Sequence, residues 1–535
     1  MTTKGDLKLT VDEVSKHNTE TDCWIIVDGV VYDITKFLKA HPGGKAILLA
    51  FAGKDVTNEF YDFHARDVLE KYGPKLRIGS VSDSVTATPT AEHRKGIDVY
   101  TPFAEPSFFR GWKSPYYKSH HLKFRNAIRA FIIDELVPLC AGCEENNEDI
   151  PNEAFLAMGR SGMIAARLGP PAIPFVKQLG LALPGGINPD ELDYFTESIC
   201  NNQASSILTH GVCDGLSAGL NIGAPPLMLF GNEFIKQKYV PPILRGEKRV
   251  CLAISEPAVG SDVAGITTTA KLNKEGTHYE VSLVKKWITG GTAADIFVTA
   301  VRTGGKGHKG LSFLVIERGP GLTTAKIKTS YSGAASTALV MFDKVMVPRE
   351  NLLGKENEAF KMIMQNFNHE RWMIIHSWFG KMRQVVADCY RWSMQRKAFG
   401  KRLIDQPVIR YKLAEMSAAI ESLEAWCDSI TYQMSNMSYE RQGVELAAPI
   451  ALLKFHTTRT CVMMADNAAQ IFGGRGVTRT GMGKRIEEFI RSYKIVSIYG
   501  GSEEVMADVA VRQEAGRLEA KLAKKDPKAI VMSRL

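Results

Sequence analysis

Two histidines in the first 80 residues are candidates for a metal-ligand pair. His41 is followed directly by Pro-Gly-Gly, and His64 lies 23 residues further along the chain. Neutral imidazole nitrogens bind iron well, and two imidazoles can hold a haem from both faces. Either histidine alone is better explained as an ordinary core or surface residue. The apolar residues between and beside them could line a haem slot: Ile47, Leu48, Leu49, Phe51, Phe60 and Phe63.

A second candidate site begins with a loop of small residues. Residues 251–266 read CLAISEPAVGSDVAGI. Loops rich in hydroxyls and free backbone amides can hold a polar or anionic cofactor, although a plain turn has the same composition. No G-x-G-x-x-G follows a predicted strand, so a nicotinamide-binding Rossmann domain has no support.

Glu370 is a candidate general base. It lies within a helix-like stretch in which the neighbours one turn away offer no ion pair: Asn366, Phe367, Met373 and Ile374. Carboxylates are seldom buried without a partner. On the pattern alone, Glu370 either pairs with another helix, remains half exposed, or serves as a base.

The elements that position these residues fall into successive regions. Turn signals are dense in residues 1–80, and residues 81–114 begin with the linker-like VSDSVTATPTAE. Helical periodicity predicts a helical domain over 115–250, strand-like periodicity a β domain over 251–350, and long helices a further domain over 351–515. Residues 516–535 form a Lys-rich tail.

The overall composition excludes several classes of protein. The chain has 535 residues with 45% hydrophobic and 23% charged side chains, which is typical of a large globular protein. No apolar run reaches the ~20 residues of a membrane-spanning helix. A net charge of +9 is mild for this length and does not favour nucleic-acid binding. The nine scattered cysteines contain a single C-x-x-C, at Cys140 and Cys143, which predicts neither a disulfide framework nor a zinc site.

The two ends of the chain differ in targeting signals. The N-terminal residues MTTKGDLKLTVDE lack the features of a secretory or transit peptide. Ser533-Arg534-Leu535 is one conservative change from the peroxisomal address S-K-L. We therefore expect a peroxisomal protein, with the cytoplasm as the alternative.

The first region resembles the cytochrome b5 family. The matching features lie in residues 23–60 and include Trp24, Tyr32-Asp33, the HPGG at 41–44 and Phe60. The resemblance implies an α+β domain that binds haem b, with His41 and His64 as the axial ligands of the haem iron. A haem with both axial positions filled carries electrons rather than oxygen. A haem-free relative remains an alternative.

The region from about 115 to 515 closely resembles the acyl-CoA dehydrogenases. Five motifs follow in the family's order: AISEPAVGSDVAGITTTA, KKWITGG, QRKAFGK, AAQIFGGRG and IYGGSEE. The resemblance implies the acyl-CoA dehydrogenase fold, which comprises an α-helical domain, a β-barrel-like middle domain and a C-terminal four-helix bundle. It also implies FAD as cofactor, an acyl-CoA substrate and a role in fatty acid β-oxidation.

The same resemblance assigns the flavin contacts. Within one subunit they are Leu252, Ile254, Ser255, Ser261, Trp287 and Thr289, and for the adenosine part Ser502 and Glu504. Positions that grip the FAD of a neighbouring subunit are Arg396, Phe399, Gln470, Gly473 and Gly474. A shared site implies a homodimer or a homotetramer.

The resemblance also settles the choice of base. Most relatives carry the catalytic carboxylate in a Tyr-Glu-Gly-Thr motif, but this chain reads Tyr499-Gly500-Gly501-Ser502. The long-chain and isovaleryl branches place their base on the earlier helix, just before an arginine, as Glu370-Arg371 stands here. Glu370 would remove the α proton while a hydride passes from the β carbon to the flavin. Arg371, Ser261 and the backbone N–H of Gly500 would contact the substrate.

The presence of a cytochrome b5-like region and an acyl-CoA dehydrogenase-like region in one chain suggests an electron path from flavin to haem. Reduced FAD would pass single electrons to the haem and on to a one-electron acceptor, or else react directly with oxygen. Two other classes stay open: a flavin enzyme with a non-CoA substrate, such as a nitroalkane oxidase, and a catalytically silent binding protein. The length and branching of the acyl group are not readable from the sequence.

Overall fold

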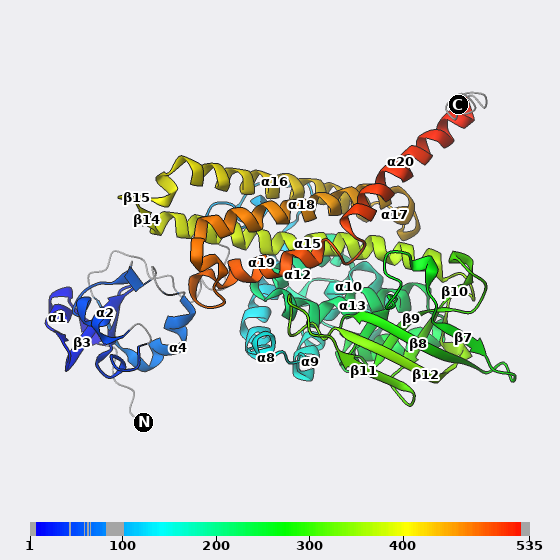
Figure 1. Ribbon diagram of the computed structural model, residues 1–535, viewed down its shortest axis with the longest axis horizontal. Coiled ribbons are helices and arrows are strands. Elements are labelled where there is room, and N and C mark those ends of the chain that lie inside the picture. Colours follow the sequence, from blue (N-terminus) through cyan, green and yellow to red (C-terminus); the bar gives the residue numbers. More distant parts are fainter. Residues whose placement is uncertain are drawn as a thin grey trace. The chain divides into compact units, whose positions relative to one another are not determined.

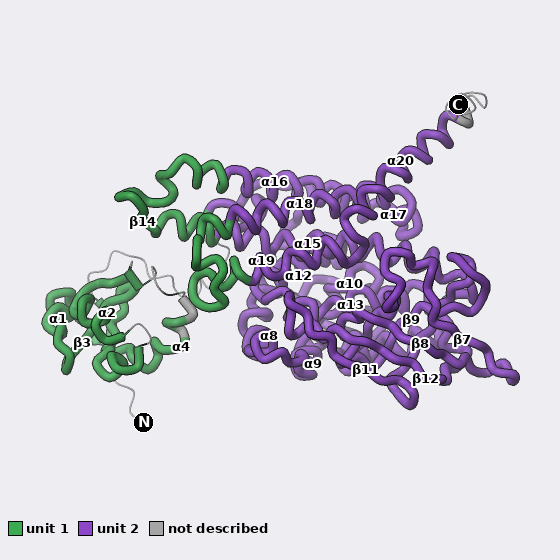
Figure 2. Tube along the Cα trace, viewed as in Figure 1, with its two compact units in different colours: residues 1–101, 388–413, 468–487 green, residues 102–387, 414–467, 488–535 purple. Residues whose placement is uncertain are grey.

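The structure is a computed structural model that describes residues 7–41, 44–57, 59–60, 64, 66–81 and 101–525. The chain divides into two compact units, drawn in different colours in Figure 2. Unit 1 contains residues 1–101, 388–413 and 468–487, and unit 2 contains the remainder. Most of the predicted linker and the Ser533-Arg534-Leu535 tripeptide lie outside the described residues.

The N-terminal part of unit 1 is built on a five-stranded sheet with the order β1-β5-β4-β3-β2. Successive side chains of strand β3 point to opposite faces of the sheet and so join two hydrophobic clusters. Cys23, Ile25 and Val27 belong to one cluster, and Ile26 belongs to the other. The strands are β1 (Leu7–Leu9), β2 (Asn18–Thr19), β3 (Asp22–Val27), β4 (Val30–Asp33) and β5 (Arg77–Val81). The helices are α1 (Val11–Ser15), α2 (Lys45–Ala50) and α4 (Arg66–Leu76).

Unit 2 begins with a helical region whose central helix is α13. Thr209 caps its N-terminus by accepting a hydrogen bond from the Val212 amide, and most of the helix is buried. The helices are α6 (Ser119–Phe131), α7 (Val137–Leu139), α8 (Cys143–Asn146), α9 (Asn152–Arg160), α10 (Met163–Leu168), α11 (Ile173–Leu179), α12 (Tyr194–Ile207), α13 (His210–Phe230) and α14 (Glu233–Leu244).

The middle region is an eight-stranded sheet whose hydrogen-bonded path runs β11-β12-β8-β7-β9-β10-β13, with β6 paired to β9. The path does not close on itself among the described strands, so the β-barrel-like domain expected from the sequence is an open sheet. The strands are β6 (Val250–Ala253), β7 (Thr269–Leu272), β8 (His278–Ile288), β9 (Ile296–Arg302), β10 (Leu311–Glu317), β11 (Leu322–Lys326), β12 (Ala338–Pro348) and β13 (Leu352–Leu353).

Close packing joins this sheet to α13. A Cβ added at Gly223 would lie 2.9 Å from the carbonyl carbon of Cys251, and one at Gly219 would lie 2.9 Å from the Val250 oxygen. Only glycine allows the helix to approach the backbone of β6 so closely. Strand β6 leads directly into the small-residue loop, so this packing fixes the position of the loop relative to the helices.

The last region consists of long helices that run side by side (Figure 1). Trp372 of α15 donates to Thr431 of α16 at 2.9 Å, and Lys381 of α15 lies 3.3 Å from Glu488 of α19. The helices are α15 (Ala359–Gln395), α16 (Pro407–Ser435), α17 (Tyr439–Glu445), α18 (Ala447–Phe472), α19 (Lys484–Val496) and α20 (Glu503–Lys525). A short hairpin, β14 (Lys397–Ala398) with β15 (Lys401–Arg402), follows α15. The predicted helical bundle is confirmed.

Candidate functional site

The two N-terminal histidines lie together as the sequence predicts. The ring centroids of His41 and His64 are 5.9 Å apart. Imidazole nitrogens bind first-row metal ions at ~2 Å, so an iron held between two rings puts their centroids about 6 Å apart. Partly buried apolar side chains pack on the core of this module, among them Leu48, Phe51 and Phe60.

The hydrogen bonds of both rings leave the same nitrogen available. Nδ1 of His41 lies 3.2 Å from the Gly44 carbonyl, and Nδ1 of His64 lies 3.1 Å from the Phe60 carbonyl. A carbonyl accepts the Nδ1 proton, which leaves Nε2 with its lone pair for a metal. Burial lowers the pKa of His64 and favours the neutral, ligating form. These residues fit a haem.

The predicted base is a buried carboxylate in unit 2. Glu370 is 8% exposed, and its Oε2 has no hydrogen-bond partner among the described residues. Burial raises the pKa of Glu370 to about 7, although the nearby charges of Arg371, Lys454 and His369 act in the opposite direction. A carboxylate with this pKa can accept a proton near neutral pH.

The loop at residues 499–501 lies against this carboxylate. A Cβ built on Gly500 would be 3.8 Å from Oε1 of Glu370 and 2.8 Å from Cδ1 of Ile374. Gly500 also has a φ of +65°, in the left-handed region that favours glycine. Glycine at this position therefore lets the loop approach Ile374 and Glu370 more closely than a side chain would allow.

Two buried cations hold the carbonyl groups of this loop. Nε of Arg371 donates to the Gly500 carbonyl at 2.8 Å, and Nζ of Lys454 donates to the carbonyls of Tyr499, at 2.7 Å, and of Gly501. No described backbone or side-chain group accepts a hydrogen bond from the Gly500 amide. The loop is thus fixed through its carbonyls, and one amide remains available. Arg371 positions this loop, and Lys454 was not predicted from the sequence.

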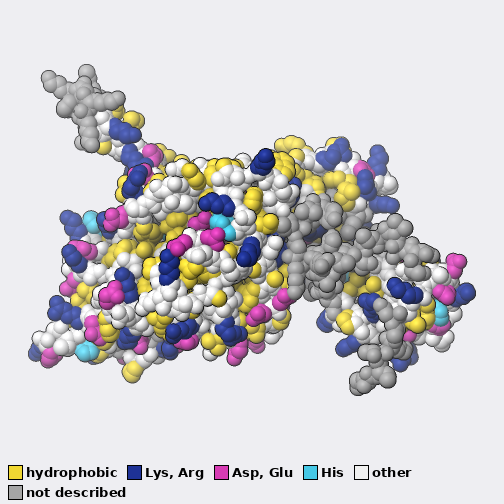
Figure 3. Space-filling model, turned by 180° about the vertical axis from the view of Figure 1, so that it is seen from behind, with side chains coloured by type: hydrophobic (Ala, Val, Ile, Leu, Met, Phe, Trp, Pro, Cys, Tyr) yellow, Lys and Arg dark blue, Asp and Glu magenta, His cyan; other side chains and the backbone are white. Residues whose placement is uncertain are grey.

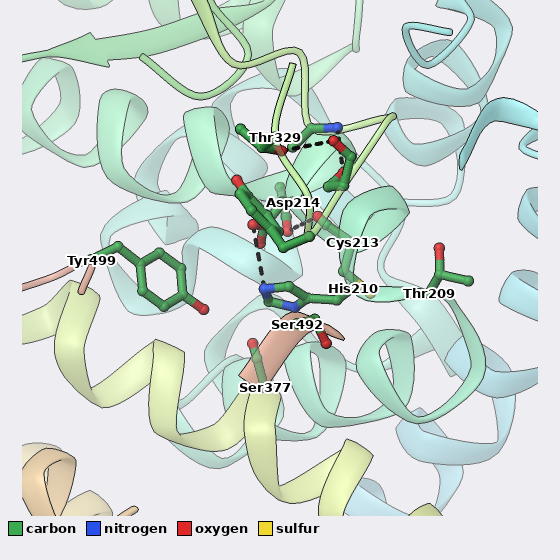
Figure 4. Close-up of polar contacts among 12 residues, drawn as sticks. Thr209, His210, Cys213, Asp214, Thr329, Ser377, Ser492 and Tyr499 are labelled. Carbon is green, nitrogen blue, oxygen red and sulfur yellow. Dashed lines mark hydrogen bonds and ion pairs between the residues drawn. The ribbon is translucent and has the colours of Figure 1, made fainter. Parts of the chain in front are cut away.

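A polar cluster anchors the other side of Tyr499. Nε1 of Trp378 donates to the Tyr499 hydroxyl at 3.0 Å. The hydroxyl of Tyr499 points toward the ring of His210, which pairs with Asp214 at 3.5 Å (Figure 4). Burial raises the pKa of Asp214 to about 7 and lowers that of His210 well below its usual value. These contacts tie α13 and α15 to the Gly500 loop.

The small-residue loop is held by a second buried glutamate, Glu256. Its carboxylate accepts hydrogen bonds from the amides and hydroxyls of Thr267 and Thr268, and lies 2.9 Å from Nζ of Lys285. Lys285 also donates to the Ile254 carbonyl at 2.9 Å. Burial alone would raise the pKa of Glu256, but Lys285 and the threonines lower it to about 2. The sequence analysis did not predict this role; the only sequence signal is the acidic residue inside the loop motif.

Four of the flavin contacts predicted for unit 2 belong to residues 251–266, and Trp287 and Thr289 lie at the end of β8 and just after it. Leu252 and Ile254 are buried, Ser255 and Thr289 are half-buried, and Ser261 is exposed. Trp287 is 54% exposed with a φ of +66°. The exposed ring of Trp287, near the polar atoms of the loop, is suited to pack against a planar cofactor.

Residues predicted to grip a neighbouring subunit's FAD belong to unit 1. All of them are exposed: Arg396, Phe399, Gln470, Gly473 and Gly474. Phe399 is 97% exposed, and a Cβ added at Gly473 or Gly474 would meet nothing within 4 Å. Ser502 and Glu504 lie instead at the start of α20 in unit 2, where Ser502 caps the helix. The residues present fit a bound FAD, and the assignment of each contact remains a prediction.

Comparison with known proteins agrees with this geometry. Family models match residues 10–82 (cytochrome b5-like heme/steroid binding domain), 118–247, 251–345 and 357–514 (N-terminal, middle and C-terminal domains of acyl-CoA dehydrogenase). The chain is 37% identical to acyl-CoA dehydrogenase apdG of Emericella nidulans over 415 residues, which are 77% of this chain and 94% of that protein.

Solved structures of this family are also similar. A Bacillus anthracis acyl-CoA dehydrogenase complexed with FAD is 26% identical, with a TM-score of 0.68 over 79% of this chain and 72% of that one. Butyryl-CoA dehydrogenase of Megasphaera elsdenii is 26% identical, with a TM-score of 0.66 over 76% of this chain and all of that one. No described helix has the length and hydropathy needed to cross a membrane. The chain belongs to the acyl-CoA dehydrogenase family, binds FAD, and carries a cytochrome b5-like haem domain at its N-terminus.

Proposed function

We propose that Glu370 is the catalytic base in the FAD-dependent conversion of an acyl-CoA to its 2,3-enoyl-CoA. The observation that carries the proposal is a buried carboxylate with an unpaired oxygen and a pKa of about 7, close to the backbone of Gly500. Elsewhere in unit 2, buried carboxylates such as Glu256 accept several hydrogen bonds. An uncommitted carboxylate in this position is suited to accept a proton from carbon.

The side chains around Glu370 perform distinct tasks in this mechanism. Glu370 removes the α proton of the substrate. The amide of Gly500 donates to the thioester oxygen, where negative charge develops as the proton leaves. Arg371 and Lys454 keep that amide oriented through the carbonyls of the loop, so little reorganisation is needed during reaction. Bound FAD supplies the acceptor for the hydride from the β carbon.

We propose further that electrons leave through the N-terminal module. His41 and His64 would hold the haem, and a haem held by two histidines would supply one-electron transfer. The acceptor beyond the haem is a one-electron carrier, and direct reaction of the flavin with oxygen is the competing exit. The exposed Phe399 and its neighbours support a homodimer or homotetramer that completes the FAD site across subunits.

An anaerobic titration of the purified holoprotein with saturated acyl-CoAs of several lengths tests both proposals. Flavin bleaching followed by the bands of reduced haem supports dehydrogenation with an internal relay. Bleaching with oxidised haem keeps the dehydrogenase and contradicts the relay. A His64→Ala variant serves as control, because it should lose the haem bands while flavin bleaching continues.

A non-CoA substrate is the competing reaction class. A nitroalkane oxidase keeps an acidic residue at the position of Gly500, and no carboxylate occupies that position here. If no acyl-CoA bleaches the flavin while a nitroalkane does, the substrate class proposed above is wrong. If no compound bleaches it, the chain is a silent binding protein.

Peroxisomal targeting remains a proposal that rests on Ser533-Arg534-Leu535. Removal of this tripeptide from a fluorescently tagged full chain should disperse the fluorescence from peroxisomes into the cytoplasm. Unchanged localisation would contradict the proposal.

A further inference from the structure

The second half of α20 is exposed on every side. The helix first packs on α18 through Met506 and Ala510, which are buried. From Val511 to Leu522 almost every side chain is exposed to solvent. Figure 3 shows this part of unit 2 projecting with apolar and basic side chains uncovered. A single helix of about a dozen residues is marginal in water, and the glycine at position 516 weakens it further.

Apolar residues follow one face of this exposed segment. Val511, Ala515, Leu518 and Leu522 are spaced by four, three and four residues, which is the spacing of a coiled-coil seam. Val511 is 66% exposed, Leu518 is 58% exposed and Leu522 is 45% exposed. The match to the family's C-terminal domain ends at residue 514, so most of the seam lies beyond the residues that this family model matches.

The charges that flank the seam identify the partner. Arg512 and Glu519 flank it on one side, while Glu514 and Lys521 flank it on the other. In an antiparallel pair of identical helices, flanking residues meet their equivalents on the same side of the seam. Arg512 then faces Glu519 of the partner subunit, and Glu514 faces Lys521 of the partner subunit. Both contacts are attractive and occur twice by symmetry.

A parallel pair would be repulsive. In that arrangement Glu514 faces Glu519 of the partner subunit on both sides of the seam. The ion pairs that these charges make within their own helix do not prevent them from pairing with a second helix. Arg512 lies 3.8 Å from Asp508, and Glu514 pairs with Arg517, but such exposed pairs contribute little. We propose that residues 511–522 of α20 form an antiparallel two-helix contact with the same segment of a second copy of this chain.

This contact differs from the shared flavin site. The residues predicted to reach a neighbour's FAD lie at 396–399 and 470–474, whereas the α20 seam begins at 511. Loss of the α20 contact should therefore leave FAD content and flavin bleaching unchanged. The proposal and the proposed function can fail independently.

Reversing the charges at residues 512 and 519, singly and together, tests the proposal. Hydrogen exchange of the backbone amides in residues 511–522 should be measured by mass spectrometry on the full-length holoprotein. Arg512→Glu alone, or Glu519→Arg alone, should speed exchange in this segment by about two- to ten-fold, since each replaces two attractive contacts by repulsive ones. The double variant Arg512→Glu/Glu519→Arg should restore wild-type protection. Gln513→Glu, on the outer side of the helix, is the matched control and should change nothing.

Co-expression distinguishes a second copy from every other partner. When the two single variants are produced together, a chain with Arg512→Glu can pair with a chain that carries Glu519→Arg. Protection from hydrogen exchange should then return. If either single variant keeps wild-type protection, the proposal is wrong. If protection is lost but neither the double variant nor the mixture restores it, another surface covers α20 and the proposal is also wrong. Equally rapid exchange in the wild type would overturn it as well.

Discussion

Two buried glutamates of unit 2 show opposite behaviour. Glu256 accepts hydrogen bonds from two threonines and forms an ion pair with Lys285, and its pKa falls to about 2. Glu370 keeps one oxygen without a partner, and burial raises its pKa to about 7. The same side chain is thus a fixed structural anion in one place and a proton acceptor in the other. Both groups are buried, and the difference lies in the charge of Lys285 and the threonine hydrogen bonds that stabilise the Glu256 carboxylate.

Removing the carboxylate of Glu370 should have the largest effect. Glu370→Gln keeps the shape of the side chain but cannot accept a proton, so turnover should fall by about 10²–10⁴-fold. Steady-state assay with an acyl-CoA and an artificial acceptor measures this loss. FAD content and thermal stability should stay at wild-type values. Retention of more than a few per cent of turnover would show that another group is the base.

Neutralising Glu256 should affect folding and cofactor retention instead. Glu256→Gln leaves the Lys285 ammonium buried without its counter-charge, which costs about 3–5 kcal/mol. Thermal unfolding and the flavin-to-protein absorbance ratio report the change. The pair Glu256→Gln/Lys285→Met removes both charges and should regain part of the stability. If Glu256→Gln were as stable as the wild type but inactive, the roles assigned to the two glutamates would be reversed.

A side chain at Gly500 should have an intermediate effect. Gly500→Ala places a Cβ against Ile374 and forces an L-residue into a left-handed conformation that costs roughly 1–2 kcal/mol. The loop should shift, and turnover should fall about ten-fold. Adding Ile374→Val removes the crowded methyl and should restore part of the rate. Gly305→Ala, where an added Cβ meets nothing within 4 Å, is the control. Full activity in Gly500→Ala would contradict the close packing described here.

The smallest effect is expected from Lys454. Its charge lowers the pKa of Glu370, so Lys454→Met should raise that pKa and move the acid limb of kcat/KM to higher pH by less than about one unit. The plateau rate at high pH should fall as well, because the carbonyls of Tyr499 and Gly501 lose their donor, and the shift of the acid limb is the smaller of the two changes. Lys361→Met changes an exposed lysine of α15, the helix that carries Glu370, and should leave the limb in place. A limb that moves to lower pH would contradict the assigned electrostatics.

The extent of sequence-based prediction differs between these regions. Resemblance to known motifs indicates His41, His64, Glu370 and the flavin loop, because each lies in a short stretch with a specific pattern. Lys454 could not be predicted, since it reaches the loop at Tyr499 from a helix 45 residues away. The same holds for Lys285, 29 residues from Glu256. Contacts of this kind depend on how the elements pack, which local patterns do not specify. The open form of the middle sheet was likewise apparent only from the strand pairing.

The pH dependence of flavin reduction tests the central claim most directly. Wild-type holoprotein should be mixed anaerobically with low concentrations of an acyl-CoA that bleaches the flavin, and the second-order rate of bleaching measured between pH 5 and 9. Proton abstraction by Glu370 requires the carboxylate form, so the rate should rise with pH through about 7 and then level off. Glu370→Gln should be slow at every pH. A wild-type rate that does not change across this range, or a Glu370→Gln variant with the wild-type profile, would contradict the assignment of Glu370 as the base.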